Sequence, residues 1–312
     1  MEESVVSVRG FRKRYGATVA VRELTFDVKR GEIFALLGPN GSGKTSTLES
    51  LEGLRHADGG ALSVDGIDPA RQPRKLARLI GVQLQTSALP PAMTVDEAMR
   101  FFAAYHGVAV RQDLVEKLGL GEKRSVQYAK LSVGQQRRLA LAIAVCHEPR
   151  VLFLDEPTAG LDVQSRVDLH AMVRELREKG TTVILATHDM AEAEKLADRA
   201  GILLRGELAA IGTPRQLTAS GAHRTRISVS TENGRLLAED VPIGGAHLAL
   251  REEGYAVYFS ENPGKAVAAI LAWLDQAGDA LVDLRVERPT LEERFLEITA
   301  ASSSPASTGG QR

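Results

Sequence analysis

Residues 33–45 carry most of the information about the fold. They begin with an apolar run, Ile33-Phe34-Ala35-Leu36-Leu37, and continue directly into Gly38-Pro39-Asn40-Gly41-Ser42-Gly43-Lys44-Thr45. The second part matches G-x-x-x-x-G-K-[ST], the phosphate-binding loop, and a helical pattern from Ser46 to Leu54 follows it. A buried strand, a glycine-rich loop and a helix are the context that this motif requires. These residues therefore predict a nucleotide-binding α/β domain.

The residue types of this loop suit a polyphosphate. Its glycines allow the backbone to curl so that successive N–H groups converge on an anion, and the helix behind them adds its dipole. Lys44 supplies a positive charge to the terminal phosphates, and the hydroxyl of Thr45 is a ligand for Mg²⁺. A glycine-rich turn with an exposed lysine is the alternative, but it leaves the flanking strand and helix unexplained. We expect residues 38–46 to bind nucleotide.

A second apolar strand, Val151-Leu152-Phe153-Leu154, ends in two acids, Asp155 and Glu156. Open α/β sheets bind their ligands at the carboxyl ends of the strands. We expect Asp155 to hold Mg²⁺, directly or through water, and Glu156 to polarise the attacking water or accept its proton. An acidic helix N-cap before Pro157 is the alternative, and the presence of a phosphate loop in the same chain argues against it.

Composition limits the class of protein further. The 312 residues are 44% hydrophobic and 25% charged, with a net charge of -1, which fits a globular chain and excludes a wholly disordered one. The longest apolar runs fall short of the ~18 residues of a membrane span, and the N-terminus lacks the pattern of a secretory signal. A single cysteine excludes an internal disulfide and fits a reducing compartment.

Three regions differ in composition. Residues 1–220 alternate short apolar strands with helical patterns, which predicts a largely parallel α/β sheet. Residues 221–300 predict a small α+β domain, in which strands are expected at 225–231, 256–260 and 281–286 and helices at 267–276 and about 290–299. Residues 301–312 are rich in serine and glycine, contain no core-forming residues and are predicted to be a disordered tail.

Further motifs stand in a fixed order around the two sites. They are Tyr15 before the phosphate loop, Gln85 after the run 79–84, Leu131-Ser132-Val133-Gly134-Gln135, Ala159-Gly160-Leu161-Asp162, and His188 after the strand 183–186. With these motifs, about residues 4–215 resemble the ATPase subunit of an ATP-binding cassette (ABC) transporter. The resemblance implies a phosphate-loop NTPase core with a helical subdomain at about residues 86–148.

The resemblance also implies a role for each motif. Tyr15 stacks on adenine, Gln85 senses Mg²⁺ and the attacking water, and His188 donates a hydrogen bond to the γ-phosphate. Ser132, Gly134 and Gln135 form the signature that closes the ATP site of a second cassette, and Asp162 belongs to the D-loop. ATP and Mg²⁺ are the expected cofactors, with Thr45, Gln85 and Asp155 at the metal.

The signature departs from the family at one position. Its usual third residue is glycine, and this chain has Val133. A β-branched residue lowers helix propensity by a few tenths of a kcal/mol and can crowd a phosphate that approaches the backbone. Because Gly134 is kept, we expect slower or altered turnover rather than inactivity. The histidines His106, His147, His170, His223 and His247 show no metal-ligand spacing and are interpreted as surface or capping residues.

The functional expectation is an ATP-hydrolysing subunit that energises a separate membrane permease of about six transmembrane helices. The motif Arg288-Pro289-Thr290-Leu291-Glu292-Glu293-Arg294-Phe295-Leu296-Glu297 resembles the end of ATPases from drug, antibiotic and polysaccharide exporters. The resemblance implies a peripheral position at the cytoplasmic face of the membrane, and either a homodimer or a dimer with a paralogue. The apolar segment 88–95 and the following helix, with Met99, Phe101, Phe102 and Tyr105, are expected to receive the permease.

Two alternatives belong to other classes of protein. A soluble cassette ATPase that acts on nucleic acid or ribosomes usually carries two cassettes or a long coiled-coil insertion, and this chain has neither, nor an extended basic face. No nucleic-acid partner is therefore expected. A generic phosphate-loop kinase would lack both the Ser132–Gln135 element and the histidine after the strand 183–186.

Overall fold

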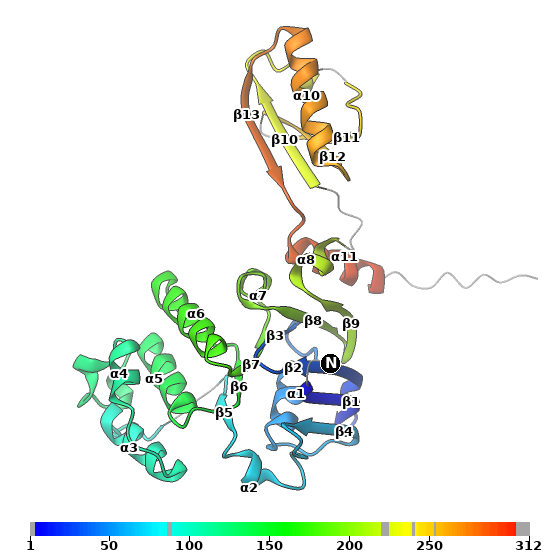
Figure 1. The fold of residues 1–312 in the computed structure, drawn as a ribbon. Helices are drawn as coiled ribbons and strands as arrows, with labels where there is room; N and C mark the ends of the chain where they lie inside the picture. Colours follow the sequence, from blue (N-terminus) through cyan, green and yellow to red (C-terminus); the bar gives the residue numbers. More distant parts are fainter. Residues whose placement is uncertain (1–3, 86–88, 220–224, 239–240, 253, 304–312) are drawn as a thin grey trace, which may run out of the picture. The chain divides into compact units, whose positions relative to one another are not determined.

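A computed structural model describes residues 4–85, 89–219, 225–238, 241–252 and 254–303. The chain divides into two compact units, Met1–Pro214 and Arg215–Arg312 (Figure 1), and each is described by itself. The predicted domain limit between residues 220 and 221 stays a prediction; the compact units divide at Pro214, where helix α8 (Pro214–Ala219) begins.

The first unit is built on a nine-stranded sheet with the order β4-β1-β2-β9-β8-β3-β7-β6-β5. Its central part is parallel and consists of β3 (Ile33–Leu37), β5 (Ile80–Gln83), β6 (Val151–Asp155), β7 (Thr182–Thr187) and β8 (Arg199–Leu204). Every residue of β3, β6 and β7 is buried, as expected for apolar strands covered on both faces. This confirms the α/β prediction and the predicted strands.

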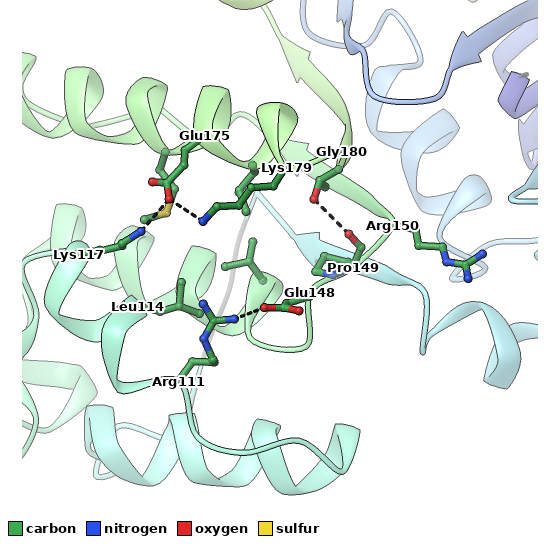
Figure 2. Close-up of a pocket in the computed structure, with 13 residues that line it drawn as sticks. Arg111, Leu114, Lys117, Glu148, Pro149, Arg150, Glu175, Lys179 and Gly180 are labelled. Carbon is green, nitrogen blue, oxygen red and sulfur yellow. Dashed lines mark hydrogen bonds and ion pairs between the residues drawn. The ribbon is translucent and has the colours of Figure 1, made fainter. Parts of the chain in front are cut away.

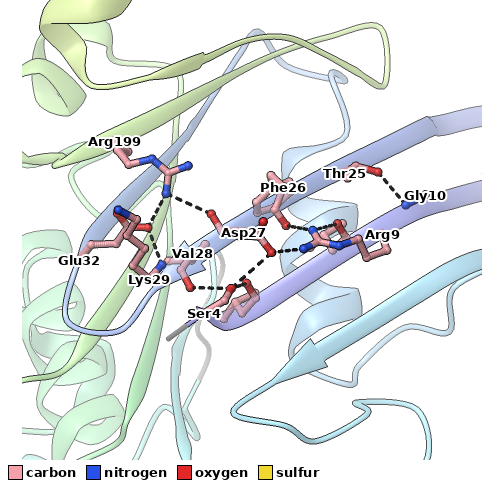
Figure 3. Close-up of polar contacts among 12 residues, drawn as sticks. Ser4, Arg9, Gly10, Thr25, Phe26, Asp27, Val28, Lys29, Glu32 and Arg199 are labelled. Carbon is pink, nitrogen blue, oxygen red and sulfur yellow. Dashed lines mark hydrogen bonds and ion pairs between the residues drawn. The ribbon is translucent and has the colours of Figure 1, made fainter. Parts of the chain in front are cut away.

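The other strands of this sheet pair mostly antiparallel: β1 (Ser4–Tyr15), β2 (Thr18–Lys29), β4 (Gly59–Val64) and β9 (Glu207–Gly212). Figure 3 shows polar contacts between this layer and the parallel strands. Buried Glu32, at the turn into β3, accepts hydrogen bonds from the Lys29 N–H at 2.6 Å and from Arg199 of β8 at 2.9 Å. Burial raises the pKa of Glu32, and the nearby Arg199 opposes that shift. These contacts fix the β1–β2 hairpin to the strands that carry the phosphate loop.

Helices cover the sheet and build a separate helical region between β5 and β6. Around the sheet lie α1 (Lys44–Leu51), α2 (Pro73–Leu76), α6 (Val163–Glu178) and α7 (Met190–Leu196). Between β5 and β6 lie α3 (Val95–His106), α4 (Gln112–Lys117), the short 3-10 turns Gly121–Lys123 and Tyr128–Lys130, and α5 (Val133–Val145). One apolar cluster joins α3, α4 and α5 to β6, β7 and α6, so the helical region is packed against the sheet. Its predicted limits, 86–148, stay a prediction.

The second unit contains a four-stranded antiparallel sheet with the order β11-β12-β10-β13. The strands are β10 (Thr225–Thr231), β11 (His247–Glu252), β12 (Tyr255–Ser260) and β13 (Leu281–Glu287), and the helices are α9 (Arg235–Ala238), α10 (Pro263–Ala277) and α11 (Leu291–Ser303). One face of the sheet packs on α10 through residues such as Ile227, Tyr258 and Ile270. The α+β prediction for this region is confirmed.

The end of the chain differs from the prediction. Helix α11 continues to Ser303, so the first residues of the predicted tail are helical because they extend the helix that begins at Leu291; the rest of that tail, 304–312, lies outside the described residues. Among the helices of the described ranges, none combines the length and apolarity that a membrane span requires.

Candidate functional site

The phosphate loop connects β3 to α1 and approaches its neighbours closely. A Cβ at Gly43, where φ is 104°, would lie 2.7 Å from the backbone oxygen of Ala20, so only glycine fits between the loop and β2. A Cβ at Gly38 would lie 2.4 Å from the backbone oxygen of Leu203. Gly43 is the N-cap of α1 and makes no side-chain cap, so the first turn of the helix keeps its N–H groups directed at the loop.

Lys44 and Thr45 begin α1 and point to different partners. The buried Lys44 ammonium donates to the carbonyl oxygens of Gly38 at 2.7 Å and Pro39 at 3.2 Å, and lies 3.7 Å from a Glu156 carboxylate oxygen. Burial lowers the pKa of Lys44, and the charges of Glu156 and Asp155 oppose that shift. The lysine is therefore held inside the loop, beside the position that the motif assigns to a phosphate.

Asp155 closes the strand β6 and lies opposite Thr45. The Thr45 hydroxyl donates to Asp155 Oδ2 at 2.9 Å, while Oδ1 is buried and has no hydrogen-bond partner among the described residues. Burial raises the pKa of Asp155, and the Thr45 hydrogen bond opposes the shift. A hydroxyl and a carboxylate with an unused oxygen are hard ligands of the kind that Mg²⁺ prefers, so these two residues fit the ion.

Glu156 follows with a left-handed backbone, φ 49°, which is strained for a residue with a side chain. Its N–H donates to the Ala186 carbonyl at 2.9 Å, which fixes it to the end of β7. The carboxylate is buried, and its Oε2 lies 2.8 Å from Nδ1 of His188, whose side chain is 58% exposed. The structure thus brings together three of the predicted residues, Lys44, Glu156 and His188, from three different strand ends.

Besides Asp155 and Glu156, a third buried carboxyl group, which the sequence analysis did not identify, belongs to Glu52. Glu52 is the C-cap of α1 and is buried, with Oε2 unpartnered among the described residues. Burial, together with the charges of Asp155 and Glu49, raises its pKa from 4.5 to about 8. No sequence motif marks this residue, because its burial depends on neighbours that are distant in the sequence.

Tyr15 stands at the end of β1, on the approach to the loop. Its hydroxyl lies 3.3 Å from the Ser46 hydroxyl, and its ring is 38% exposed. The Lys13 ammonium and the Arg55 guanidinium lie 5.3 and 5.6 Å from the ring centroid. An exposed aromatic ring beside the first turn of α1 is suited to stacking on a base, which stays a prediction for Tyr15.

The signature residues begin α5. Ser132 is the N-cap: its hydroxyl accepts from the Gln135 N–H at 3.2 Å, and the Ser132 N–H donates to Oε1 of Gln135 at 2.9 Å. Val133 is 57% exposed, so its side chain is not needed for packing within the chain. Gly134 faces Leu161 and Ser165, where an added Cβ would find ordinary contacts at 3.5–3.6 Å. In the described part, no hydrogen bond joins these residues to the phosphate loop.

Two predicted residues make no contact with the cluster around Glu156. Asp162 is the N-cap of α6, and its carboxylate accepts from the N–H and the hydroxyl of Ser165, both at 2.8 Å. The Ser165 N–H bond lowers the pKa of Asp162. Gln85 is exposed at a bend after β5, directly before residues 86–88, which lie outside the described ranges. The roles predicted for both residues stay predictions.

Two side-chain contacts that the sequence did not reveal, an ion pair and a histidine–carboxylate hydrogen bond, join α6 to the start of α7. Arg166 lies 3.3 Å from Asp189, the neighbour of His188, and one turn further His170 lies 3.2 Å from Glu192. Both members of the second pair are buried, so the interpretation of His170 as a surface residue was wrong. Its exposure was misjudged because its partner is 22 positions away in the sequence.

An apolar groove of about 710 Å³ lies beside the helical region. It is lined by Leu84 and Leu89, by Phe102 and Tyr105 of α3, and by Glu52, among others. Tyr105 and the adjacent Phe101 are 70% and 57% exposed, whereas Met99 is buried in the helical core. Burial and His106 lower the pKa of His147 in the groove to about 4, and Glu52 has a pKa of about 8, so both side chains are uncharged at pH 7.

A second pocket, of about 360 Å³, lies between α4, the end of α5 and the end of α6 (Figure 2). Its charged side chains pair with one another: Arg111 with Glu148, and both Lys117 and Lys179 with Glu175 at 2.7 Å. The Lys117 and Lys179 hydrogen bonds lower the pKa of Glu175 to about 2. These ion pairs tie the helical region to α6, and the pocket contains none of the predicted site residues.

Comparison with known proteins bears on the whole chain. A family model described as "ABC transporter" matches residues 21–159. The linearmycin resistance ATP-binding protein LnrL of Bacillus subtilis is 34% identical over 95% of this chain and 98% of its own length. The daunorubicin resistance ATP-binding protein DrrA3 of Streptomyces coeruleorubidus is 33% identical over 96% of this chain and 97% of its own length.

Other similar proteins match about 70% of the chain. The Nod factor export ATP-binding protein I of Burkholderia orbicola is 39% identical over 70% of this chain and 74% of its own length. Among solved structures, an ATP-binding subunit of an ABC transporter superimposes with a TM-score of 0.65 at 30% identity, over 69% of this chain and 92% of its own.

Proposed function

Because the chain belongs to the ABC transporter family, as an ATP-binding and ATP-hydrolysing subunit, we propose that Glu156 is its catalytic base and that two cassettes enclose each ATP. The observation that supports this most directly is the buried Glu156 carboxylate, held between Lys44 at 3.7 Å and His188 at 2.8 Å. A carboxylate in this position can accept a proton from water that attacks a phosphate bound in the loop.

In this proposal the bound nucleotide replaces Glu156 as the partner of Lys44 and His188. The γ-phosphate takes hydrogen bonds from Lys44 and His188, which frees the Glu156 carboxylate to accept a proton from the attacking water. The water oxygen forms a bond to phosphorus as the bond to the ADP oxygen breaks. Bound Mg²⁺, held by Thr45 and Asp155, supplies charge neutralisation for the phosphates.

The second cassette follows from where the signature lies. Ser132 and Gly134 begin α5 next to Leu161 of the D-loop segment, and in the described part no hydrogen bond ties them to the phosphate loop of the same chain. A helix N-terminus with a serine cap is suited to an anion. We propose that these two residues, with Gln135 and Asp162, complete the ATP site of a second copy or a paralogue.

The permease is proposed to dock in the apolar groove beside α3. The groove is uncharged at pH 7 and has exposed Tyr105 at its rim, with exposed Phe101 next to it, which suits an amphipathic helix of a membrane partner. Such docking would hold the ATPase at the cytoplasmic face of a membrane. Relatives named for linearmycin and daunorubicin resistance and for Nod factor export support export as the direction of transport.

The test compares Glu156→Gln with Glu178→Gln, a substitution of an exposed carboxylate on α6. Glu156→Gln should lower the kcat of ATP hydrolysis by roughly 10²-fold or more, because the base is lost, while ATP affinity measured by calorimetry stays close to that of the wild type. Glu178→Gln should leave both unchanged. Substantial hydrolysis by Glu156→Gln would remove Glu156 from the role of base.

A further inference from the structure

Strand β13 forms one edge of the four-stranded sheet in the second unit, beside β10 (Figure 1). Its side chains Val282 and Val286 are 62% and 46% exposed, although Ile227, the residue of β10 opposite Val286, is buried. An open strand edge with apolar side chains is a template for pairing with another strand. The edge therefore has the properties of an interface.

The opposite edge of the sheet is protected in the way that monomeric proteins protect their edges. In β11, a register shift between Leu248 and Leu250 interrupts the pairing with β12, and the strand ends in Arg251 and Glu252. Strand β13 contains no proline and pairs in register with β10 from Asp283 to Glu287, with one register shift at Val282, between Leu281 and Asp283. Asp283–Glu287 is therefore the longest stretch of uninterrupted pairing on either edge strand.

The sequence of this open edge is self-complementary. It reads Val282-Asp283-Leu284-Arg285-Val286, with a valine at each end and opposite charges on either side of a central leucine. We propose that β13 pairs antiparallel with β13 of a second copy of this chain, centred on Leu284. In this register Asp283 of each copy faces Arg285 of the other, and Val282 faces Val286, so the four inner cross-strand pairs are favourable, while Leu281 faces Glu287 at the two ends.

Neighbouring registers are unfavourable for identifiable reasons. Centring the pair on Asp283 or on Arg285 places two like charges opposite each other. Shifting one strand by a single residue places valines opposite charged residues. It also places the apolar side chains of the two copies on opposite faces of the joined sheet. The register centred on Leu284 is therefore specified by charge as well as by side-chain alternation.

The register centred on Leu284 also brings the apolar clusters under α10 of the two copies together. Leu284 packs against the cluster under α10, opposite buried Val229. In the proposed pair, Leu284 and the two valines of both copies lie on the face that carries α10, so the two apolar clusters become continuous. A single strand pair buries less than the ~800 Å² per partner of a standard interface, so the contact is weak alone and gains effective concentration once two cassettes share a permease. It needs no nucleotide and stands whether or not the proposed ATP-bridged dimer exists.

The experiment uses the full chain without nucleotide and mixes two charge variants. Asp283→Arg leaves two positive residues on the edge, and Arg285→Asp leaves two negative ones, so each variant repels its own copy. Mixed together, they regain opposite charges at both cross-strand pairs. Arg251→Glu, on the opposite edge, is the control. Native mass spectrometry and sedimentation velocity measure the masses of the species.

Wild type and Arg251→Glu should dimerise in a concentration-dependent way. Each charge variant alone should dimerise on the order of tenfold more weakly, and the mixture should give a heterodimer with affinity near the wild-type value. Recovery only on mixing cannot arise from the contact between Asp283 and Arg285 within one chain. A wild type that is monomeric at its highest soluble concentration, or a mixture no better than its components, would overturn the proposal.

Cross-linking tests the register independently. Chains with Val282→Cys mixed with chains with Val286→Cys should be joined by a short bismaleimide, because these positions face each other in the proposed pair. Chains with Val282→Cys alone should not, because their cysteines would be offset by four residues, or ~14 Å. The native Cys146 is buried and does not interfere. Equal cross-linking in both samples would overturn the register.

Discussion

At the scale of single residues, the proposed ATP site depends on charged side chains that are buried. Lys44, Asp155 and Glu156 are buried, and Glu156 also keeps a strained backbone, φ 49°. Buried charges are costly unless they are paired, so their arrangement favours a ligand that completes the set. Strain and unsatisfied polar atoms at one strand end are features expected of a functional site.

Lys44→Ala should weaken ATP binding by about 10- to 100-fold, because a charge-assisted contact with phosphate contributes on the order of 1.5–3 kcal/mol. Isothermal titration calorimetry measures the change in Kd. Lys75→Ala, which removes an exposed ammonium from α2, is the matched control and should bind like the wild type. An unchanged Kd for Lys44→Ala would place the phosphate elsewhere.

Glu52 predicts a pH dependence of stability. Its pKa is about 8 in the folded chain against 4.5 for the free group, so the folded state holds a proton that the unfolded state releases. The free energy of unfolding therefore falls as the pH rises between about 4.5 and 8. Glu52→Gln, which resembles the protonated form, should be more stable than the wild type at pH 8 by on the order of 4 kcal/mol and nearly equal to it at pH 4.5.

Urea denaturation of the protein without nucleotide, at both pH values, measures this difference. Glu178→Gln is again the control, because its carboxyl group is exposed. A stability difference between Glu52→Gln and the wild type that does not change with pH would show that Glu52 is already ionised in the folded state.

At the scale of elements, α6 and α7 connect the two loops that precede them. The D-loop leads into α6 and the His188 loop leads into α7, and the helices are joined by Arg166 with Asp189 and by His170 with Glu192. Because the second pair is buried, the two helices are held in one arrangement at the turn nearest His188. Movement of one loop should therefore be transmitted to the other.

Glu192→Gln should lower the kcat of ATP hydrolysis severalfold with little change in KM, because it loosens the support of His188 without touching the binding loop. Arg174→Ala removes a contact between the same helices, to the Lys195 carbonyl at 3.1 Å, but farther along them. It should leave kcat unchanged. Equal effects of both variants would reduce the role of Glu192 to general stability.

At the scale of the whole molecule, we propose two separate surfaces for a second copy of the chain. One is the signature end of α5 in the first unit, which is proposed to need ATP, and the other is the open edge of β13 in the second unit, which does not. The resemblance to full-length relatives covers both units. Nucleotide and protein concentration should therefore act on association independently.

Mg-ATP should drive dimer formation by Glu156→Gln, because bound ATP that is not hydrolysed keeps the two cassettes joined. The double variant Glu156→Gln with Asp283→Arg should still respond to Mg-ATP, although it starts from a weaker nucleotide-free dimer. Size-exclusion chromatography with light scattering measures both, with ADP as the control. Monomers throughout in Mg-ATP would contradict the two-cassette site.

Much of the site was predictable because its signals are local. The phosphate loop needs only the strand and helix beside it, and the caps at Ser132 and Asp162 involve partners three residues away. The contacts between Glu156 and His188 and between Thr45 and Asp155 span 32 and 110 positions. The resemblance to a family predicted that these residues belong to one site. The distances between their side chains cannot be obtained from the pattern of apolar and polar residues in the sequence.

The amino-acid sequence by itself determined the short buried strands, the phosphate loop, the acid pair and the helix caps, because each depends on neighbours within a few positions. Only the tertiary structure decided that Glu52 holds a proton at neutral pH, that His170 is buried against Glu192, and that β13 lies at an open edge. Burial, pKa and strand order are set by groups distant in sequence, so they exist only once the chain has packed.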